Sequence, residues 1–280
     1  MIARAVLQLF LPKRYKQLEV DLCRLALFVK PDWTMEKVLW MDSRSKLEVI
    51  EAWAVSQATE GLKDTSKVNV EVGPSLAENA GEGVFCLNGA KAGTLICVHP
   101  GTMHSADSVR KASERGSGRL YERIFVHDLP HCVQLFDGTL IDAGRDSEGE
   151  WQAHPFAVGH KCNHPPKGVK PNVMKCPFWW NPEPAVNVNF KTVAEENVAK
   201  ENDDDTSSSF TERFGLVERI RNEMGFSSSK VNQIRGLGFV TTRDVVPGEE
   251  LFVNYRYNPK IPAPEWYHPV DVTEDEARWS

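Results

Sequence analysis

Hydrophobic residues in the first 62 positions recur at helical spacing. In the segment 16–30 they lie four, three and four residues apart on one helical face: Leu18, Leu22, Leu25 and Val29. A second segment begins after Asp42 and Ser43, which suit a helix N-cap, and we expect it to end at Gly61. The pattern predicts a helical N-terminal region over residues 1–62, with a structural role.

The first 18 residues leave two interpretations open. They carry four basic residues and no acidic one, which is typical of organelle transit peptides. Val6, Leu7 and Phe10 also share one helical face, as in a basic amphipathic helix that packs on the domain. We favour the amphipathic helix.

From about residue 66 the pattern becomes that of strands. Val68, Val70 and Val72 alternate with polar residues, as in a half-buried strand. Short apolar runs separated by Gly, Pro and Asp follow as far as Tyr255, without an internal repeat. The sequence therefore predicts an α+β protein with a mostly β domain over residues 63–257, rather than a βαβ sheet.

Two further segments differ from this domain in composition. Residues 195–209 are polar, which indicates a surface insertion, and residues 211–225 read as a short amphipathic helix that ends at Gly225. We therefore predict a loop-and-helix insertion at about 192–232. Residues 258–280 are rich in proline and aromatic side chains and end in acidic ones, so we expect a strap over the core and an acidic tail.

Composition argues against several functional classes. The 280 residues carry a formal charge of -6 without a basic stripe, so nucleic acid is not an expected partner, whereas a basic peptide suits the charge. Six cysteines without a C-x-x-C pair favour a reducing compartment, and no apolar run has the roughly 18 residues of a membrane span. We expect an intracellular protein of the nucleus or cytoplasm, or of the mitochondrion if the N-terminus is a transit peptide. The oligomeric state stays open.

The stretch GHKCNHPPKGVKPNV, residues 159–173, suggests metal ligation. His160, Cys162 and His164, with Cys176 further along, are side chains of the kind that zinc binds in fours. Neighbouring ligands usually need a turn between them, however, and residues at i, i+2 and i+4 of an extended segment point to one side. We keep a zinc-binding module as an alternative and expect no metal.

Three separated motifs are informative together. The first is AGEGVF at 80–85, in which Gly81 and Gly83 let the backbone approach a ligand. The second contains the pair Asn163-His164, followed by Pro-Asn at 171–172. The third is GEELFVNY at 248–255, a turn into an expected strand that presents Tyr255 near its end.

In this order the motifs resemble those of the SET-domain protein methyltransferases. The resemblance covers roughly residues 66–257. The motifs PGT at 100–102, DGTLID at 137–142, PFAVG at 155–159 and GEELFVNY at 248–255 resemble most those of the divergent group called SET domain-containing protein nine. The resemblance implies a SET-type β-clip of several small sheets, in which the Asn-His loop and the Tyr255 strand cross in a pseudoknot. It also implies S-adenosylmethionine on one face and a lysine side chain that enters a narrow channel from the other.

The resemblance also assigns residue roles. Tyr255 would be catalytic, at the point of methyl transfer. The residues implied in cofactor binding are Gly81, Glu82, Gly83, Phe85, Asn163, His164 and Tyr255. Those implied in the substrate channel are His99, Tyr257 and Trp266.

This chain departs from the usual family pattern at several positions. The loop between His164 and Pro171 is three residues longer, and it begins with two prolines in place of Ser-Cys. Asn254 stands where Asp is common. His99 stands where a channel tyrosine is common, and we favour a packed core residue over a channel residue. The aromatic residues after Tyr255 either close the lysine channel or belong to the strap.

Three functions follow as expectations. The first is an S-adenosylmethionine-dependent protein methyltransferase, with lysine as the acceptor side chain and histidine as a variant of it. The second is a catalytically weak or inactive SET scaffold that binds a protein partner. The third is the zinc-binding module.

Overall fold

The computed structural model describes residues 13–117, 132–135, 139–143, 154–180, 234–260 and 262–279. The α-helices are α2 (Lys13–Val29), α3 (Met35–Trp40), α4 (Ser43–Lys63), α5 (Ala106–Arg115) and α8 (Val272–Trp279). Two 3-10 helices are η1 (Thr65–Lys67) and η3 (Gly159–Lys161). The strands are β1 (Val70–Pro74), β2 (Glu82–Cys86), β3 (Leu95–Val98), β4 (Thr102–His104), β5 (Cys132–Gln134), β6 (Leu140–Asp142), β7 (Val173–Trp180) and β8 (Ile234–Thr241).

Helices α2 and α4 confirm the helical reading of the N-terminal pattern. The Asp42 carboxylate caps α4 by accepting a hydrogen bond of 2.8 Å from the Ser45 N–H. The predicted end at Gly61 was wrong, because α4 continues to Lys63. Gly61 serves packing instead, since a Cβ there would lie 2.6 Å from the ring of Phe156. The choice between a transit peptide and a helix at the N-terminus falls mostly on residues outside those described.

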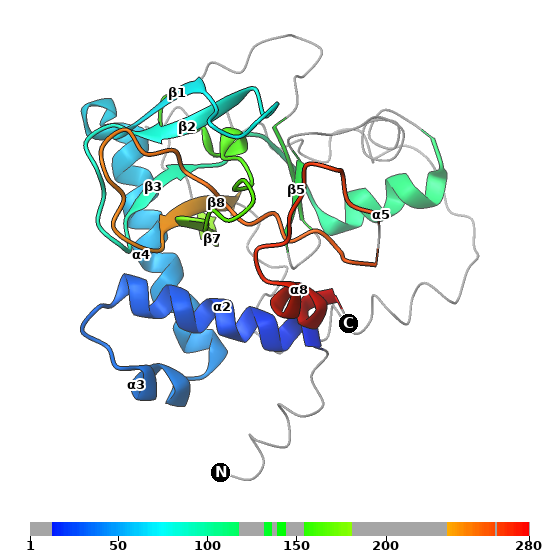
Figure 1. The fold of residues 1–280 in the computed structure, drawn as a ribbon. Coiled ribbons are helices and arrows are strands. Elements are labelled where there is room, and N and C mark those ends of the chain that lie inside the picture. The colour runs from blue at the N-terminus through cyan, green and yellow to red at the C-terminus, as the bar shows by residue number, and fades with distance from the viewer. Residues whose placement is uncertain are drawn as a thin grey trace.

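In the part of the chain that the structure describes, the strands form three small antiparallel sheets, with strand orders β1-β2, β3-β8-β7 and β4-β6-β5. This architecture confirms the predicted α+β class with small sheets. Figure 1 shows α2 and α8 side by side below the sheets, although they come from distant parts of the sequence.

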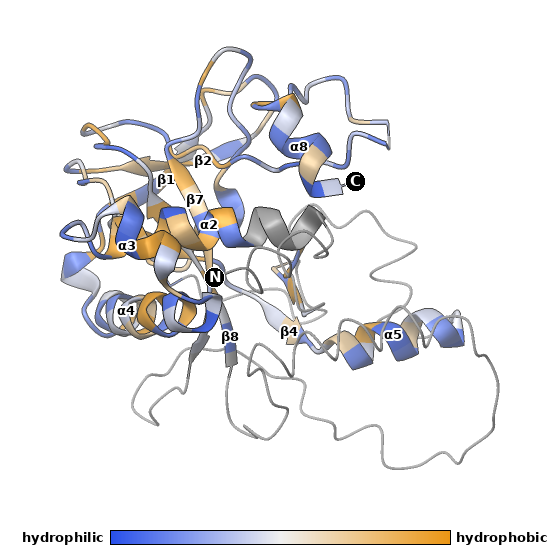
Figure 2. Ribbon diagram, turned by 90° about the horizontal axis from the view of Figure 1, so that it is seen from below, coloured by the Kyte–Doolittle hydropathy of each residue, from blue (hydrophilic) through white to orange (hydrophobic). Residues whose placement is uncertain are grey.

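The main core lies between the N-terminal helices and the sheet β3-β8-β7. Ile50, Ala54 and Ala58 on α4 are fully buried and belong to one cluster with Phe178 of β7 and Val240 of β8. In Figure 2 the hydrophobic residues of α2, α4 and β7 gather in the same part of the molecule, whereas α5 extends away from it. The helices therefore cover the sheet through an apolar face, as amphipathic helices do.

Strands β7 and β8 pair along their whole length, from Val173 opposite Thr241 to Trp180 opposite Ile234. Residues 181–233 thus connect two neighbouring strands. The insertion predicted at about 192–232 falls within this connection and lies outside the described residues.

Two local expectations differ from the structure. The segment LFVNY is not a regular strand, because residues 250–253 make only isolated bridges to three separate segments. Its residues Leu251, Phe252 and Val253 are all buried, since neighbours cover both sides. The expected acidic tail forms the helix α8, which packs against α2. Among the described helices, none is long and apolar enough to cross a membrane.

Candidate active site

The GEEL segment passes between two asparagine-bearing segments of the chain. On one side lies Asn172, whose side chain donates to the Glu250 carbonyl at 2.8 Å and accepts from the Phe252 N–H at 2.7 Å. The side chain of Asn172 thus pairs with the backbone as a neighbouring strand would. Asn172 is fully buried, so both hydrogen bonds are shielded from water.

Asn163 lies on the other side of the same segment. Its carbonyl accepts a hydrogen bond of 2.9 Å from the Val253 N–H. Its side-chain amide donates to the Glu82 carbonyl at 2.8 Å, and it also contacts Ser75 Oγ at 3.0 Å and Glu250 Oε1 at 3.3 Å. One residue therefore joins the Gly81–Gly83 motif to the segment that leads to Tyr255.

The longer loop between these asparagines does not disturb them. Its extra length forms an exposed turn over residues 167–170, which is closed by a 3.0 Å hydrogen bond from the Val169 N–H to the Pro166 carbonyl. Gly168 has φ +83°, a left-handed conformation that glycine adopts at little cost. The added residues project outward, so the departure from the family pattern leaves the crossing intact.

Glu250 is the buried charge at the centre of this arrangement, with a side chain 1 % exposed. It accepts hydrogen bonds of 2.6 Å from both Ser75 Oγ and the Leu76 N–H. A Cβ on Gly83 would overlap its carboxylate, lying 2.8 Å from Cδ. The space over Gly83 is therefore taken by a protein carboxylate, which by itself accounts for the glycine.

Gly81 differs from Gly83 in what surrounds it. It has φ +71°, and a Cβ there would meet nothing within 4 Å. Next to it, Glu82 pairs with Lys161 at 2.6 Å, and this hydrogen bond lowers the pKa of the Glu82 carboxyl. Phe85 follows on β2, where it pairs with Glu71 of β1 and bridges to Glu250.

Tyr255 is held at both its backbone and its hydroxyl. Its N–H donates to His164 Nδ1 at 3.3 Å, and its hydroxyl donates to the Cys162 carbonyl at 3.2 Å. Burial is the main cause that raises the pKa of the Tyr255 phenol above its ordinary value. The phenol is therefore neutral at physiological pH.

His164 uses both ring nitrogens within the protein. Since Nδ1 accepts from Tyr255, the proton sits on Nε2, which donates to the His268 carbonyl at 2.8 Å. Burial lowers the pKa of His164, which agrees with this neutral form. His164 thus links Tyr255 to the C-terminal segment.

Tyr257, Trp266 and Tyr267 form an aromatic group next to Tyr255, and the first two contact its ring. Tyr257 and Trp266 lie with ring centroids 6.0 and 6.2 Å from Tyr255, and they lie 6.1 Å from each other. Tyr267 stacks on Tyr257 at 4.7 Å and lies 4.4 Å from the His164 ring. Trp266 is 52 % exposed, so this aromatic group forms part of the surface next to Tyr255.

His99 has packing contacts of its own. It is buried, stacks on Phe239 of β8 at 6.4 Å between ring centroids, and meets His160 edge-on at 6.2 Å. Its Nδ1 lies 2.6 Å from the Pro100 carbonyl. These contacts agree with the packed interpretation, and a role in a substrate channel stays a prediction.

The histidines and cysteines considered for zinc do not gather around one point. Cys162 belongs to the hydrophobic cluster with Val84 and Leu251, whereas Cys176 belongs to the cluster under α4. Both ring nitrogens of His164 are engaged, as described above. Among the residues that the structure describes, no group of three or more His, Cys, Asp or Glu side chains could hold a metal ion.

Sequence reasoning missed Ser75, Asn172 and Glu250 as residues that build the site. Two of them lie inside quoted motifs, the Pro-Asn at 171–172 and the second glutamate of GEEL. An acidic residue between a Gly-Glu turn and an apolar run was the available signal for a buried carboxylate. Ser75 carries no signal of its own, because its role depends on the β1–β2 hairpin.

Comparison with protein families agrees with this geometry. Residues 81–256 match the family model for the SET domain, which is well over half of the chain. The chain belongs to the SET-domain family. The SET match begins at the Gly81 motif and ends one residue after Tyr255, so it excludes α2, α3, α4 and α8. A search of curated proteins found no significant match.

Proposed function

We propose that this SET-domain chain is an S-adenosylmethionine-dependent protein methyltransferase that acts on lysine side chains. The observation that carries the proposal is the position of Asn163, which contacts both the Gly81–Gly83 motif and the segment leading to Tyr255. Within the SET-domain family, we also propose that the chain is most similar to the SET domain-containing protein nine group.

The residues around Gly81 and Asn163 fit the methionine end of S-adenosylmethionine. Open space over Gly81 leaves room for a ligand against the backbone. The side-chain nitrogen of Asn163 donates to protein acceptors, so we assign its side-chain oxygen, Oδ1, to accept from the amine of the cofactor. We assign Gly81, Glu82 and Asn163 to its methionine end. When bound, S-adenosylmethionine supplies a methyl group on a positively charged sulfur.

Tyr255 has the chemistry to orient an amine acceptor. Its hydroxyl hydrogen is directed to the Cys162 carbonyl, so the oxygen lone pairs can accept an N–H from a lysine amine. The amine must lose its proton to water before it can attack, and its ordinary pKa is about 10.4. A channel that excludes water from the amine would disfavour the charged form and lower that pKa. Alignment of the two reactants then supplies much of the rate.

The test combines cofactor binding with methyl transfer. Calorimetry with S-adenosylmethionine measures binding to the intact chain, and labelled cofactor with arrays of lysine peptides measures transfer. We expect Tyr255→Phe to bind the cofactor within about threefold of wild type and to lose at least tenfold in transfer. Arrays with each lysine replaced by arginine identify the acceptor.

Each outcome separates the candidate functions. Full turnover by Tyr255→Phe contradicts the role given to Tyr255. Label on histidine rather than lysine keeps the reaction and changes the acceptor. No cofactor binding at millimolar concentration contradicts the enzyme and favours a scaffold that binds a protein partner.

A further inference from the structure

Arg256, the residue directly after Tyr255, has an unfavourable backbone conformation. Its φ is +56°, in the left-handed region that favours glycine. A residue with a Cβ stays in this region only where its surroundings fix it there. The contacts that fix Arg256 therefore also fix the direction in which the chain leaves Tyr255.

Arg256 is held at its N–H, its carbonyl and its guanidinium group. The N–H donates to Asn254 Oδ1 at 3.0 Å, and the carbonyl accepts from Trp279 Nε1 at 3.0 Å. Asn254 thus supplies the acceptor oxygen that the more usual aspartate would supply. The guanidinium pairs with Asp21 at 3.2 Å and with Glu274 at 2.8 Å.

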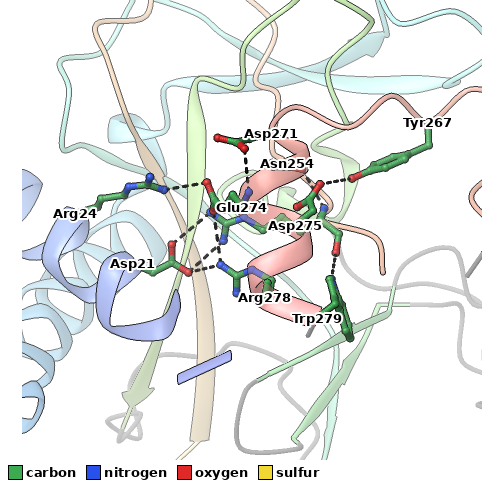
Figure 3. Close-up of polar contacts among 10 residues, drawn as sticks. Asp21, Arg24, Asn254, Tyr267, Asp271, Glu274, Asp275, Arg278 and Trp279 are labelled. Carbon is green, nitrogen blue, oxygen red and sulfur yellow. Dashed lines mark hydrogen bonds and ion pairs between the residues drawn. The ribbon is translucent and has the colours of Figure 1, made fainter. Parts of the chain in front are cut away.

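These charges belong to a cluster between α2 and α8. We call it the Arg256 cluster, and it consists of Asp21, Arg24, Arg256, Glu274 and Arg278. Arg278 pairs with Asp21 at 2.7 Å, and Arg24 pairs with Glu274 at 3.3 Å. Figure 3 shows the labelled side chains of α2 and α8 converging from the two helices.

The cluster is shielded from solvent at its centre. The Asp21 and Glu274 side chains are 12 % and 14 % exposed, compared with 66 % for Arg44 in an ordinary surface pair on α4. Ion pairs with little solvent contact are screened less than surface pairs. Arg256 is the last residue of the SET match, and its ion-pair partners Asp21 and Glu274 both lie outside the matched span.

Helix α8 also reaches the aromatic group beside Tyr255. Asp275 is buried and accepts a hydrogen bond of 3.4 Å from the Tyr267 hydroxyl. That hydroxyl in turn accepts from the Tyr257 N–H at 3.2 Å. The helix thus contacts the Tyr255 segment through Arg256 and through the Tyr257–Tyr267 pair.

We propose that Asp21, Glu274 and Arg278 are positioning residues, which set the place of Tyr255 through Arg256. Helices α2 and α8, which both lie outside the SET match, are then structural parts of the active site. The effect on catalysis rests on the function proposed above, whereas the effect on the position of Tyr255 does not.

Tyrosine ring signals in NMR test the position directly. The chain has five tyrosines, so ring-labelled protein and single Tyr→Phe variants allow each signal to be assigned. We expect Asp21→Asn and the milder Arg278→Gln to shift or broaden the Tyr255 signal. Arg256→Gly should do the same although it relieves the backbone conformation. Arg44→Gln, which breaks an exposed pair on α4, should leave the signal unchanged.

Activity provides the second measurement. We expect Arg278→Gln to lower kcat at least tenfold while the Kd for S-adenosylmethionine changes less than twofold, a division that general destabilisation would not produce. An unchanged Tyr255 signal in the folded cluster variants overturns the inference. A chain that neither binds the cofactor nor transfers methyl groups overturns the proposed function, and the NMR comparison still decides the positioning role.

Discussion

Replacing Gly83 by alanine tests whether the buried carboxylate of Glu250 is what requires a glycine at this position. The new Cβ would overlap Glu250 Oε1 and lie 2.8 Å from its Cδ and 3.3 Å from the backbone of Ser75. The overlap with the carboxylate is much closer than the contact with Ser75. The carboxylate is therefore the group that has to move. Its displacement breaks the two 2.6 Å hydrogen bonds from Ser75 Oγ and the Leu76 N–H.

The expected loss in unfolding free energy follows from these two bonds. A hydrogen bond to a charged group contributes about 1.5–3 kcal/mol, so Gly83→Ala should cost roughly 3–6 kcal/mol. That is a large part of the roughly 5–15 kcal/mol by which a typical domain is stable. Gly81→Ala is the matched control, because it adds only the strain of a left-handed alanine, about 1–2 kcal/mol.

Urea unfolding followed by circular dichroism measures both variants. A double-mutant cycle with Glu250→Ala then identifies the mechanism, because removing the carboxylate removes the overlap. The loss in Gly83→Ala/Glu250→Ala should fall short of the sum of the single losses by roughly 3–6 kcal/mol, because the whole loss assigned to Gly83→Ala comes from displacing that carboxylate. In contrast, Gly81→Ala and Glu250→Ala should be additive. Equal losses for the two glycine variants, or an additive Gly83 cycle, would refute the reasoning.

Two further predictions concern Lys175 and Asn172 on and beside β7. Burial, with the charges of Arg256 and Arg278 next, lowers the pKa of Lys175 from 10.5 to about 8. As the pH rises, the folded state therefore loses this proton at a lower pH than the unfolded state does. Below about pH 8 the positive charge of Lys175 destabilises the folded state. Lys175→Met should raise the free energy of unfolding at pH 7 by at most about 3 kcal/mol. Measured by thermal unfolding, this gain should shrink between pH 8 and 10.5. A gain that stays constant across that range contradicts this account. Asn172→Ala removes two buried hydrogen bonds and should cost about 2–4 kcal/mol in urea unfolding, so a loss below about 1 kcal/mol would contradict its role in the crossing.

The N-terminal helices could be predicted from the sequence because they depend on local patterns. Leu22, Leu25 and Val29 share one face and are buried in the structure, as their spacing indicates. The meeting of the two distant segments around Asn163 and Tyr255 was implied by the family resemblance that their motifs carry, and the structure brings these segments together.

Other features depend on neighbours that the local sequence does not reveal. Residues 251–253 lose the alternation of a strand because other segments cover both of their sides. Gly83 is a glycine because Glu250 lies above it, and nothing around Gly83 in the sequence shows this. Helix α8 has few apolar residues, because much of its contact with the rest of the protein is made by ion pairs.

The pairing of Asp21 with Arg278 spans 257 positions of the sequence. It cannot form during synthesis until both helices have left the ribosome. The segment that carries Tyr255 emerges before α8, so Arg256 is made before two of its partners exist. Contacts this distant in sequence also form late when a chain folds, because a long loop has to close first. The centre around Tyr255 should therefore be among the last parts of the molecule to reach its final shape.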